Sequence, residues 1–331
     1  MLLVLTAVAV TARQLAGGRQ PGAVASPRPL DRIGPPATSS EPDYPPPVRF
    51  QQYHAVEMAR GGVGTVYRAT HPETGKVYAI KQLSRQFVQD QLVIHAFHQG
   101  AAMLMDLRHP SIVKVYYDWD ERNEGWQDHF VVMEYLPGET LHDLIRSEAP
   151  VPLDDRLMGI INGIGEALSY LHAHDIVHRD IKPENFRLAD SRYKLLDFDT
   201  AIRRSQRGLY APDGMPVGTP EYMSPEQARA ATDIDFRADV YSLGMLLYEL
   251  LTGAVPFNGA PSRVLIDQME TAVQSPRKLN ALVPEPVADI ILMALHKDRD
   301  RRFQSISAMM AAFQNAYAAT RSTRGEDGAS R

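Results

Sequence analysis

The hydrophobic periodicity of this sequence changes near residues 137–140 ("PGET"). Before that point apolar and polar residues alternate in short runs, which indicates β-strands, and a polar loop, "ERNEGWQD" (121–128), separates the last two of them. One helical stretch over 84–107 ends before Pro110. After it helical spacing dominates, and it covers 140–146, 153–174, 236–252, 261–272 and 285–296. We therefore predict an α+β fold with a strand-rich first lobe, a helix-rich second lobe and a cleft between them.

The two ends of the chain differ in composition from this folded part. Residues 1–47 combine an apolar leader, "MLLVLTAVAV", with a Pro-rich linker that we expect to be disordered, and 318–331 read as a disordered tail. The leader is too short to span a bilayer and no Lys or Arg precedes Arg13, so a targeting segment and a leader without that role remain alternatives. We expect a cytoplasmic protein with no membrane contact apart from this N-terminus.

Charge and cysteine content restrict the partners. The net charge of -5 gives no general attraction to nucleic acid, so none is expected as a partner. The chain contains no Cys, which excludes disulfides and thiolate metal sites. Any metal must then be held by oxygen or histidine ligands, and this favours hard ions such as Mg²⁺.

A glycine-rich segment and a strand lysine suggest phosphate contacts. "ARGGVGTVYRA" places Gly61, Gly62 and Gly64 between two predicted strands, where backbone amides can approach a phosphate closely. A hairpin with glycines in its turn explains the same residues. Lys81 follows on a predicted strand, and its ammonium could pair with the α and β phosphates of a nucleotide or stand at a sheet edge.

The string "IVHRDIKPENF" concentrates groups suited to phosphoryl transfer. Asp180 can accept a proton from an attacking hydroxyl, Lys182 can balance charge on the transferring group, and Asn185 can hold Mg²⁺. Asp197, in "KLLDFDTAI", follows Asn185 by twelve residues, and a hairpin of that length would bring it beside Asn185 as a second metal ligand. Phe198 is then expected to be a packing residue.

In this order the motifs resemble those of a eukaryotic-type protein kinase, most closely the Hanks-type serine/threonine kinases of bacteria, over roughly 50–313. The resemblance implies a bilobal protein-kinase fold: an antiparallel-sheet N-lobe with one main helix (about 48–135) and a mostly helical C-lobe (about 136–317). It implies transfer of the γ-phosphoryl of ATP, with Mg²⁺, to Ser or Thr of protein substrates, among which the chain itself is one candidate. Lys182 and Thr219 match the pattern of Ser/Thr kinases.

The resemblance also assigns roles to further residues. The nucleotide would contact Gly61, Gly62, Gly64, Val66, Ala79, Lys81, Glu134, Leu136, Glu139 and Asn185, with the backbone of "MEYL" binding adenine. The catalytic set would be Asp180, Lys182, Lys81 and Thr219, and the metal ligands Asn185 and Asp197. Asp239 would hydrogen-bond the catalytic-loop backbone, and Glu226 in "GTPEYMSPEQ" would form a buried ion pair with Arg302.

Three positions depart from the family pattern. Gly100 stands where a helix glutamate usually holds the strand lysine, and Gln99 or Asp90 are possible substitutes. Arg187 replaces an apolar residue under adenine, unless Leu188 fills that place. Asp199 replaces the Gly of the family's metal-binding triplet Asp-Phe-Gly, and this change predicts a stiffer loop. Two alternatives follow: a pseudokinase that acts as a nucleotide-binding scaffold, and a small-molecule kinase, which the segment "GTPEYMSPEQ" argues against.

One acidic residue suggests constitutive activity. Counting back from Thr219, Asp213 occupies the place where bacterial relatives often carry a phosphorylated Thr. We hypothesise that Asp213 supplies a fixed negative charge for Arg179. The alternative is a solvated turn residue in "PDG".

Overall fold

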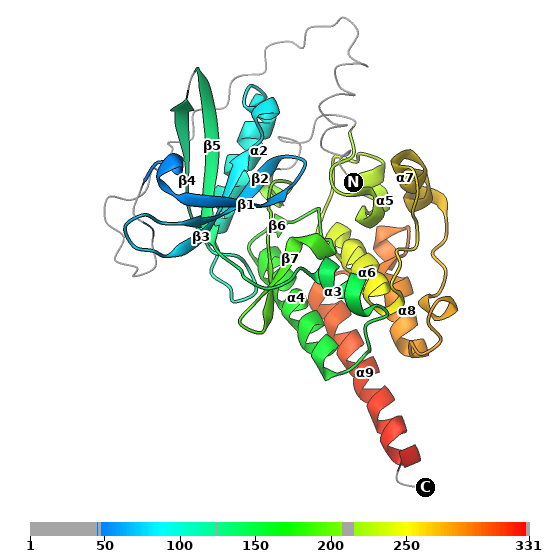
Figure 1. Cartoon of the computed structure of the whole chain (residues 1–331). Helices are drawn as coiled ribbons and strands as arrows, with labels where there is room; N and C mark the ends of the chain where they lie inside the picture. Colours follow the sequence, from blue (N-terminus) through cyan, green and yellow to red (C-terminus); the bar gives the residue numbers. More distant parts are fainter. Residues whose placement is uncertain (1–44, 46–47, 124, 207–214, 329–331) are drawn as a thin grey trace, which may run out of the picture. The chain divides into compact units, whose positions relative to one another are not determined.

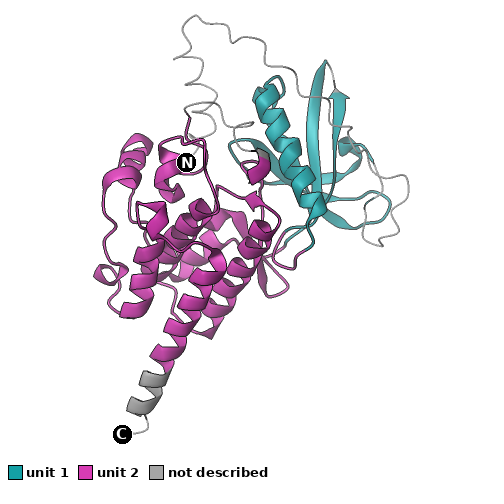
Figure 2. Cartoon of the chain, turned by 180° about the vertical axis from the view of Figure 1, so that it is seen from behind, with its two compact units in different colours: residues 1–108, 113–136 teal, residues 109–112, 137–331 magenta. Residues whose placement is uncertain are grey.

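A computed structural model describes residues 45, 48–123, 125–206 and 215–328. The chain forms two compact units: unit 1 extends to Arg108 and resumes over Val113–Leu136, and unit 2 comprises His109–Ile112 and the chain from Pro137 onward (Figure 2). Asp213 and the apolar leader lie outside the described residues. Among the described helices, none is long and apolar enough to cross a membrane.

Unit 1 contains a five-stranded antiparallel sheet with strand order β1-β2-β3-β5-β4 (Figure 1). The strands are β1 (His54–Arg60), β2 (Gly64–Thr70), β3 (Val77–Leu83), β4 (Val115–Asn123) and β5 (Trp126–Glu134). Buried apolar residues of β3 and β5, such as Ile80 and Val132, pair directly across the sheet and form part of its core. The α+β fold class and the antiparallel first lobe are therefore confirmed.

The β4–β5 hairpin is longer than the sequence predicted. A polar loop was expected over 121–128, but residues 121–123 and 126–128 continue the ladder, with Asp120 opposite His129 and Asn123 opposite Trp126. The Trp119 ring stacks on its cross-strand partner Phe130 at a centroid distance of 4.7 Å, which favours the extended pairing. Polar side chains are thereby placed on the sheet rather than in a loop.

One main helix, α2 (Gln91–Asp106), packs against β4 and β5. It begins later than predicted because the Asp90 carboxylate caps it, accepting hydrogen bonds from the amides of Leu92 and Val93. A short 3₁₀ turn, Arg85–Phe87, precedes it. Asp90 therefore has a structural role at the start of the helix.

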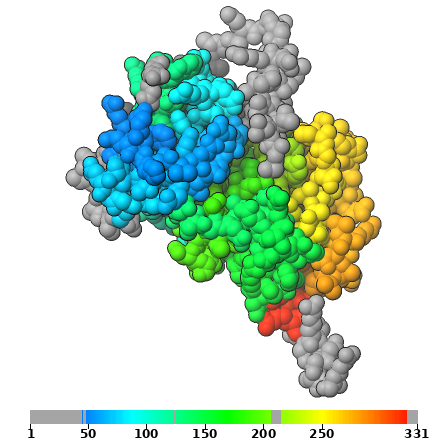
Figure 3. All heavy atoms as spheres, in the orientation of Figure 1, coloured from blue at the N-terminus to red at the C-terminus, as the bar shows by residue number. Residues whose placement is uncertain are grey.

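Unit 2 is mostly helical, as predicted. Its helices are α3 (Leu141–Glu148), α4 (Asp155–Ala173), α5 (Pro225–Ala228), α6 (Arg237–Thr252), α7 (Pro261–Glu270), α8 (Glu285–Ala294) and α9 (Ile306–Gly328). Helix α6 is buried on nearly every face and contacts α8 and α9. Helix α4 packs along α9, and in the space-filling view the visible red atoms of α9 lie directly below green atoms of unit 2 (Figure 3).

Helix α9 continues past residue 318, so the structure differs from the disordered tail expected for 318–331. Two contacts hold this part of the helix: the hydroxyl of Tyr317 donates to the Asp155 carboxylate at 2.9 Å, and Arg321 also binds that carboxylate. The Ala-rich sequence around Tyr317 has high helix propensity. The prediction of a disordered tail followed its polar composition and gave too little weight to this helix propensity.

Candidate functional site

The loop that carries the predicted catalytic residues is fastened to the core of unit 2 by Asp239. This fully buried carboxylate of α6 accepts hydrogen bonds from the backbone amides of His178 (3.0 Å) and Arg179 (2.9 Å) and contacts His172 Nε2 at 2.8 Å. Burial by itself would raise the pKa of Asp239, but these partners outweigh it and the pKa is lowered. The predicted contact between Asp239 and the loop backbone is confirmed.

Asp180, Lys182 and Thr219 form a closed triangle of polar contacts. The Thr219 hydroxyl donates to Asp180 Oδ1 at 2.7 Å, and Lys182 Nζ lies 2.7 Å from Asp180 Oδ2 and 2.8 Å from Thr219 Oγ1. Burial would lower the pKa of Lys182, but the carboxylates of Asp180, Asp197 and Glu184 raise it. The lysine is thus held as a cation beside a carboxylate.

Asn185 and Asp197 offer oxygen atoms suited to a hard cation. Asn185 Nδ2 donates to the carbonyl of Asp180 at 2.8 Å, so the amide oxygen is the atom that remains for a metal. The predicted hairpin is present as β7 (Phe186–Ala189) and β8 (Arg192–Leu195), after which the amide of Leu196 donates to Asn185 O at 2.7 Å. This bond brings the segment before Asp197 back to Asn185. An amide oxygen and a carboxylate fit Mg²⁺.

In the segment Asp197–Phe198–Asp199, the left-handed backbone conformation occurs at Asp197 and not at Asp199. Asp197 has a φ of 52°, in the left-handed region, and its carboxylate accepts a hydrogen bond from the Asp199 amide at 3.3 Å. Phe198 is buried and its ring meets His178 edge-on at 4.9 Å, as expected for a packing residue. The stiffer loop expected from Asp199 stays a prediction.

A residue that the sequence analysis missed supports the same loop. Gln227 Nε2 donates to the carbonyls of Arg179 (2.7 Å) and Val217 (3.0 Å), and its side chain also completes a capping box with Ser224 at the start of α5. The string "SPEQ" carries the spacing of such a box, which is the signal that could have found it. Gln227 links the catalytic loop to the segment before Thr219.

The buried ion pair between Glu226 and Arg302 is present. Two nitrogens of Arg302 donate to the two Glu226 oxygens at 2.7 Å each, and the Arg302 side chain is fully buried. Arg302 also donates to the carbonyls of Arg237, His296 and Lys297. Every side of this guanidinium is thus satisfied.

The predicted nucleotide contacts of unit 1 lie in the turn between β1 and β2, on β2, β3 and β5, and directly after β5. Val66 is the cross-strand partner of Lys81, and Ala79 is the partner of Met133. Lys81 Nζ lies 5.8 Å from the centre of the Phe97 ring of α2, the helix in which Gly100 is buried. Glu134 accepts the amide of Lys114 at 2.7 Å, and the buried Leu136 is the last residue of unit 1.

The glycines of the β1–β2 turn differ in what their surroundings require. A Cβ at Gly64 would lie 2.3 Å from the Gln82 carbonyl oxygen, so the neighbouring strand excludes any side chain there. A Cβ at Gly61 would meet only ordinary contacts, its amide donating to Gly64 O at 2.8 Å. Gly62 lies in the turn between the two strands.

Glu139 and Arg187 lie on neighbouring segments of unit 2. The Glu139 carbonyl accepts the Leu188 amide at 2.9 Å, and the Tyr193 hydroxyl donates to the Glu139 carboxylate at 3.4 Å. Arg187 forms a β-bridge with Thr140. A Cβ at Gly138 would lie 2.7 Å from Leu188 Cβ, so Leu188 lies close against Gly138.

Comparisons with known proteins agree with this arrangement. Residues 54–317 match the model of the protein kinase domain. The chain is 36% identical over 255 residues to a probable serine/threonine-protein kinase of Streptomyces coelicolor, covering 76% of this chain and 38% of that protein. It is 34% identical to serine/threonine-protein kinase PknB of Mycolicibacterium smegmatis (76% and 40%) and 33% identical to PrkC of Bacillus subtilis (79% and 40%). It thus spans about two fifths of the length of these curated relatives.

Proposed function

Because this chain belongs to the protein kinase family, and within it to the Hanks-type serine/threonine kinases of bacteria, we propose that it transfers the γ-phosphoryl group of ATP to a Ser or Thr hydroxyl of a protein substrate. The chain itself is one possible substrate. The observation that carries the proposal is the triangle of Asp180, Lys182 and Thr219.

Each member of the triangle has a chemical task in this reaction. Asp180 orients the substrate hydroxyl and accepts its proton as the oxygen–phosphorus bond forms and ADP leaves. The Lys182 ammonium lies beside that carboxylate and offsets negative charge on the transferring group. Thr219 holds both side chains in place. Asn185 and Asp197 would hold Mg²⁺, which neutralises charge on the phosphates when bound.

The proposed nucleotide contacts of unit 1 keep the roles suggested by the sequence. Lys81 would pair with the α and β phosphates, and the amides around Gly61 and Gly62 would approach the phosphate chain. The departures at Gly100, Arg187 and Asp199 fall on supporting positions rather than on the groups that meet phosphate or metal. We therefore expect a reduced rate rather than an inactive protein. A cytoplasmic location remains a prediction.

The test is phosphate incorporation from γ-labelled ATP by the purified full chain, with and without casein as a generic acceptor. We expect label on Ser or Thr in the wild type and its loss in Asp180→Asn. The matched control is Asp190→Asn, because Asp190 is an exposed residue of the β7–β8 turn whose left-handed conformation Asn tolerates. Absence of incorporation in the wild type, with a thermal shift on addition of ATP, would instead identify a nucleotide-binding scaffold.

A further inference from the structure

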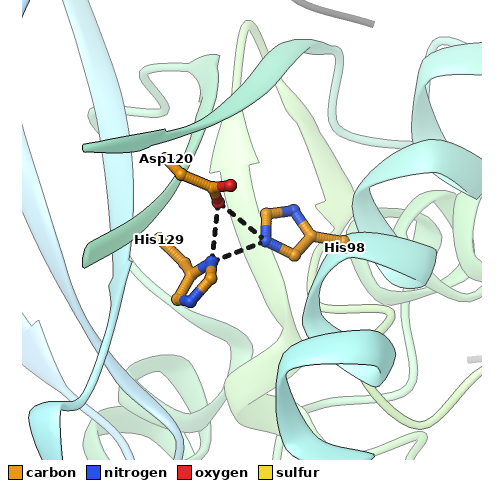
Figure 4. Close-up of side chains that lie close together, drawn as sticks. All are labelled: His98, Asp120 and His129. Atoms are coloured by element: carbon orange, nitrogen blue, oxygen red, sulfur yellow. Dashed lines mark hydrogen bonds and ion pairs between the residues drawn. The ribbon is translucent and has the colours of Figure 1, made fainter. Parts of the chain in front are cut away.

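Three potential metal ligands converge in unit 1, on residues that have no part in the proposed phosphoryl transfer. Figure 4 shows His98 of α2, Asp120 of β4 and His129 of β5 pointing toward one another. His98 Nε2 lies 2.9 Å from His129 Nδ1 and 3.3 Å from Asp120 Oδ1, and His129 Nδ1 lies 2.7 Å from that same oxygen. One donor atom from each of three elements thus meets in a small triangle.

The fold explains why these side chains meet. Asp120 and His129 are direct partners in the β4–β5 ladder, so their side chains leave the sheet on the same face. Helix α2 packs against these strands and supplies His98. The side chains of His98, Asp120 and His129 are only 13%, 10% and 2% exposed, so bulk water competes weakly for the donor atoms.

A fourth residue orients one of the ligands. His98 Nδ1 contacts the carboxylate of Asp118, which lies on the same face of β4 as Asp120. A carboxylate oxygen accepts a hydrogen bond from a ring N–H, so the tautomer that this contact favours leaves the lone pair of Nε2 directed into the triangle. A carboxylate behind a histidine is the arrangement that fixes metal-binding imidazoles in proteins.

We propose that His98 Nε2, Asp120 Oδ1 and His129 Nδ1 bind a divalent transition-metal cation, with Zn²⁺ the best fit. Two imidazole nitrogens and one carboxylate, with water in the fourth position, are a donor set that Zn²⁺ accepts. Bonds of about 2.0–2.1 Å to a tetrahedral ion place its donors about 3.3–3.4 Å apart. The observed separations of 2.7, 2.9 and 3.3 Å require only a small outward movement of the side chains. Mg²⁺ and Ca²⁺ prefer oxygen ligands and fit poorly.

An ion at this position would join α2 to both strands of the hairpin. The residue before His98 is Phe97, the ring beneath Lys81 Nζ, so the same turn of α2 faces both the metal ligands and the strand lysine. A metal ion that binds the folded form and not the unfolded form stabilises the folded form by mass action. We therefore expect Zn²⁺ to raise the Tm of unit 1 and to protect the amides of α2, β4 and β5 from hydrogen exchange.

The experiment uses the full chain, stripped with a chelator and dialysed, and titrates Zn²⁺ by calorimetry without nucleotide. We expect one equivalent bound in the wild type, loss of that binding in His98→Gln, Asp120→Asn and His129→Gln, and about 10–100-fold weaker binding in Asp118→Asn. The matched control is His54→Gln, an exposed histidine of β1. Asp197→Asn, which removes the proposed Mg²⁺ ligand of unit 2, should bind Zn²⁺ as the wild type does.

A spectroscopic measurement keeps the proposal testable if a variant fails to fold. Co²⁺ added to the wild-type protein should give the intense visible absorption of a tetrahedral nitrogen and oxygen site, and excess Mg²⁺ should not remove it. A weak octahedral spectrum, or Zn²⁺ binding that survives His129→Gln, would overturn the site. The result is independent of kinase activity because no step of the assay uses ATP.

Discussion

The hydroxyl of Thr219 joins the two charged residues of the catalytic loop, since it donates to Asp180 Oδ1 at 2.7 Å and accepts from Lys182 Nζ at 2.8 Å. Removing it should loosen both side chains without removing either charge. Because a hydrogen bond to a charged group contributes about 1.5–3 kcal/mol, Thr219→Ala should lower kcat by about 10- to 100-fold.

Steady-state kinetics with varied ATP and casein provide the measurement. Thr219→Ser keeps the hydroxyl and should recover most of kcat, while KM for ATP changes little in either variant. If the serine variant were as slow as the alanine variant, the methyl group rather than the hydrogen bonds would be responsible.

Because Glu226 and Arg302 form a buried ion pair, we expect the effects of substituting the two residues on the free energy of unfolding to be strongly coupled. Removing one partner leaves a buried charge without its counter-charge, so Glu226→Gln or Arg302→Met alone should lower the free energy of unfolding of unit 2 by about 3–5 kcal/mol. The double variant should lose less than the sum of the two. The double variant should still be less stable than the wild type, because Arg302 also donates hydrogen bonds to three backbone carbonyls.

Urea unfolding followed by far-UV circular dichroism suits this measurement, since unit 2 is mostly helical. Arg156→Gln is the control, because Arg156 of α4 pairs with Glu148 and both side chains are exposed. Strictly additive losses in the double variant would mean that the two side chains do not stabilise each other.

Whether a contact can be predicted from the sequence depends on how far apart its residues lie along the chain. The β7–β8 hairpin and the approach of Asp197 to Asn185 follow from spacing along the chain, and both were predictable. The bond from Gln227 to Arg179 O joins residues 48 apart, and no local pattern places a particular carbonyl within reach of a given amide. Family resemblance supplied Asp239 and Arg302 because it carries information on such distant contacts.

Backbone conformation and polar strands were predicted less well. The family pattern draws attention to Asp199, because a Gly is expected there, whereas the fold places the left-handed backbone conformation at Asp197. The polar residues 121–128 looked like a loop, but cross-strand packing of Trp119 on Phe130 keeps the hairpin extended. Pattern analysis weighs each residue by its own polarity, while a strand is stabilised by its neighbours across the sheet.

The two glycines Gly61 and Gly64 should respond differently to the same substitution. Gly64→Ala places a methyl group 2.3 Å from the Gln82 carbonyl oxygen, so β2 and β3 must separate, at a cost of about 1–3 kcal/mol in the stability of unit 1. Gly61→Ala should leave stability unchanged and weaken ATP binding if its backbone approaches phosphate. Trp119 and Trp126, the two tryptophans of the chain, both lie in unit 1, so fluorescence reports on this unit. Equal stability of the two variants would contradict the close approach.

Acidification should destabilise unit 2 through His178. Burial lowers the pKa of this histidine below its usual value of 6.5, although the nearby carboxylates of Asp239, Asp180 and Asp197 act in the opposite direction. The unfolded chain takes up a proton at His178 near pH 6.5, whereas the folded chain does so only at lower pH. The unfolded state therefore binds more protons in this window, and stability falls as the pH drops below about 6.5.

Hydrogen exchange of α6 and of the catalytic loop, or urea unfolding between pH 5 and 7.5, measures this dependence. One extra proton in the unfolded state corresponds to about 1.4 kcal/mol per pH unit, and burial lowers the pKa of His109 in the same direction. His178→Phe should reduce the slope by up to one proton and leave the share of His109. An unaltered slope in His178→Phe would show that His178 takes up its proton equally in both states, so that its burial contributes nothing to the acid sensitivity of the loop.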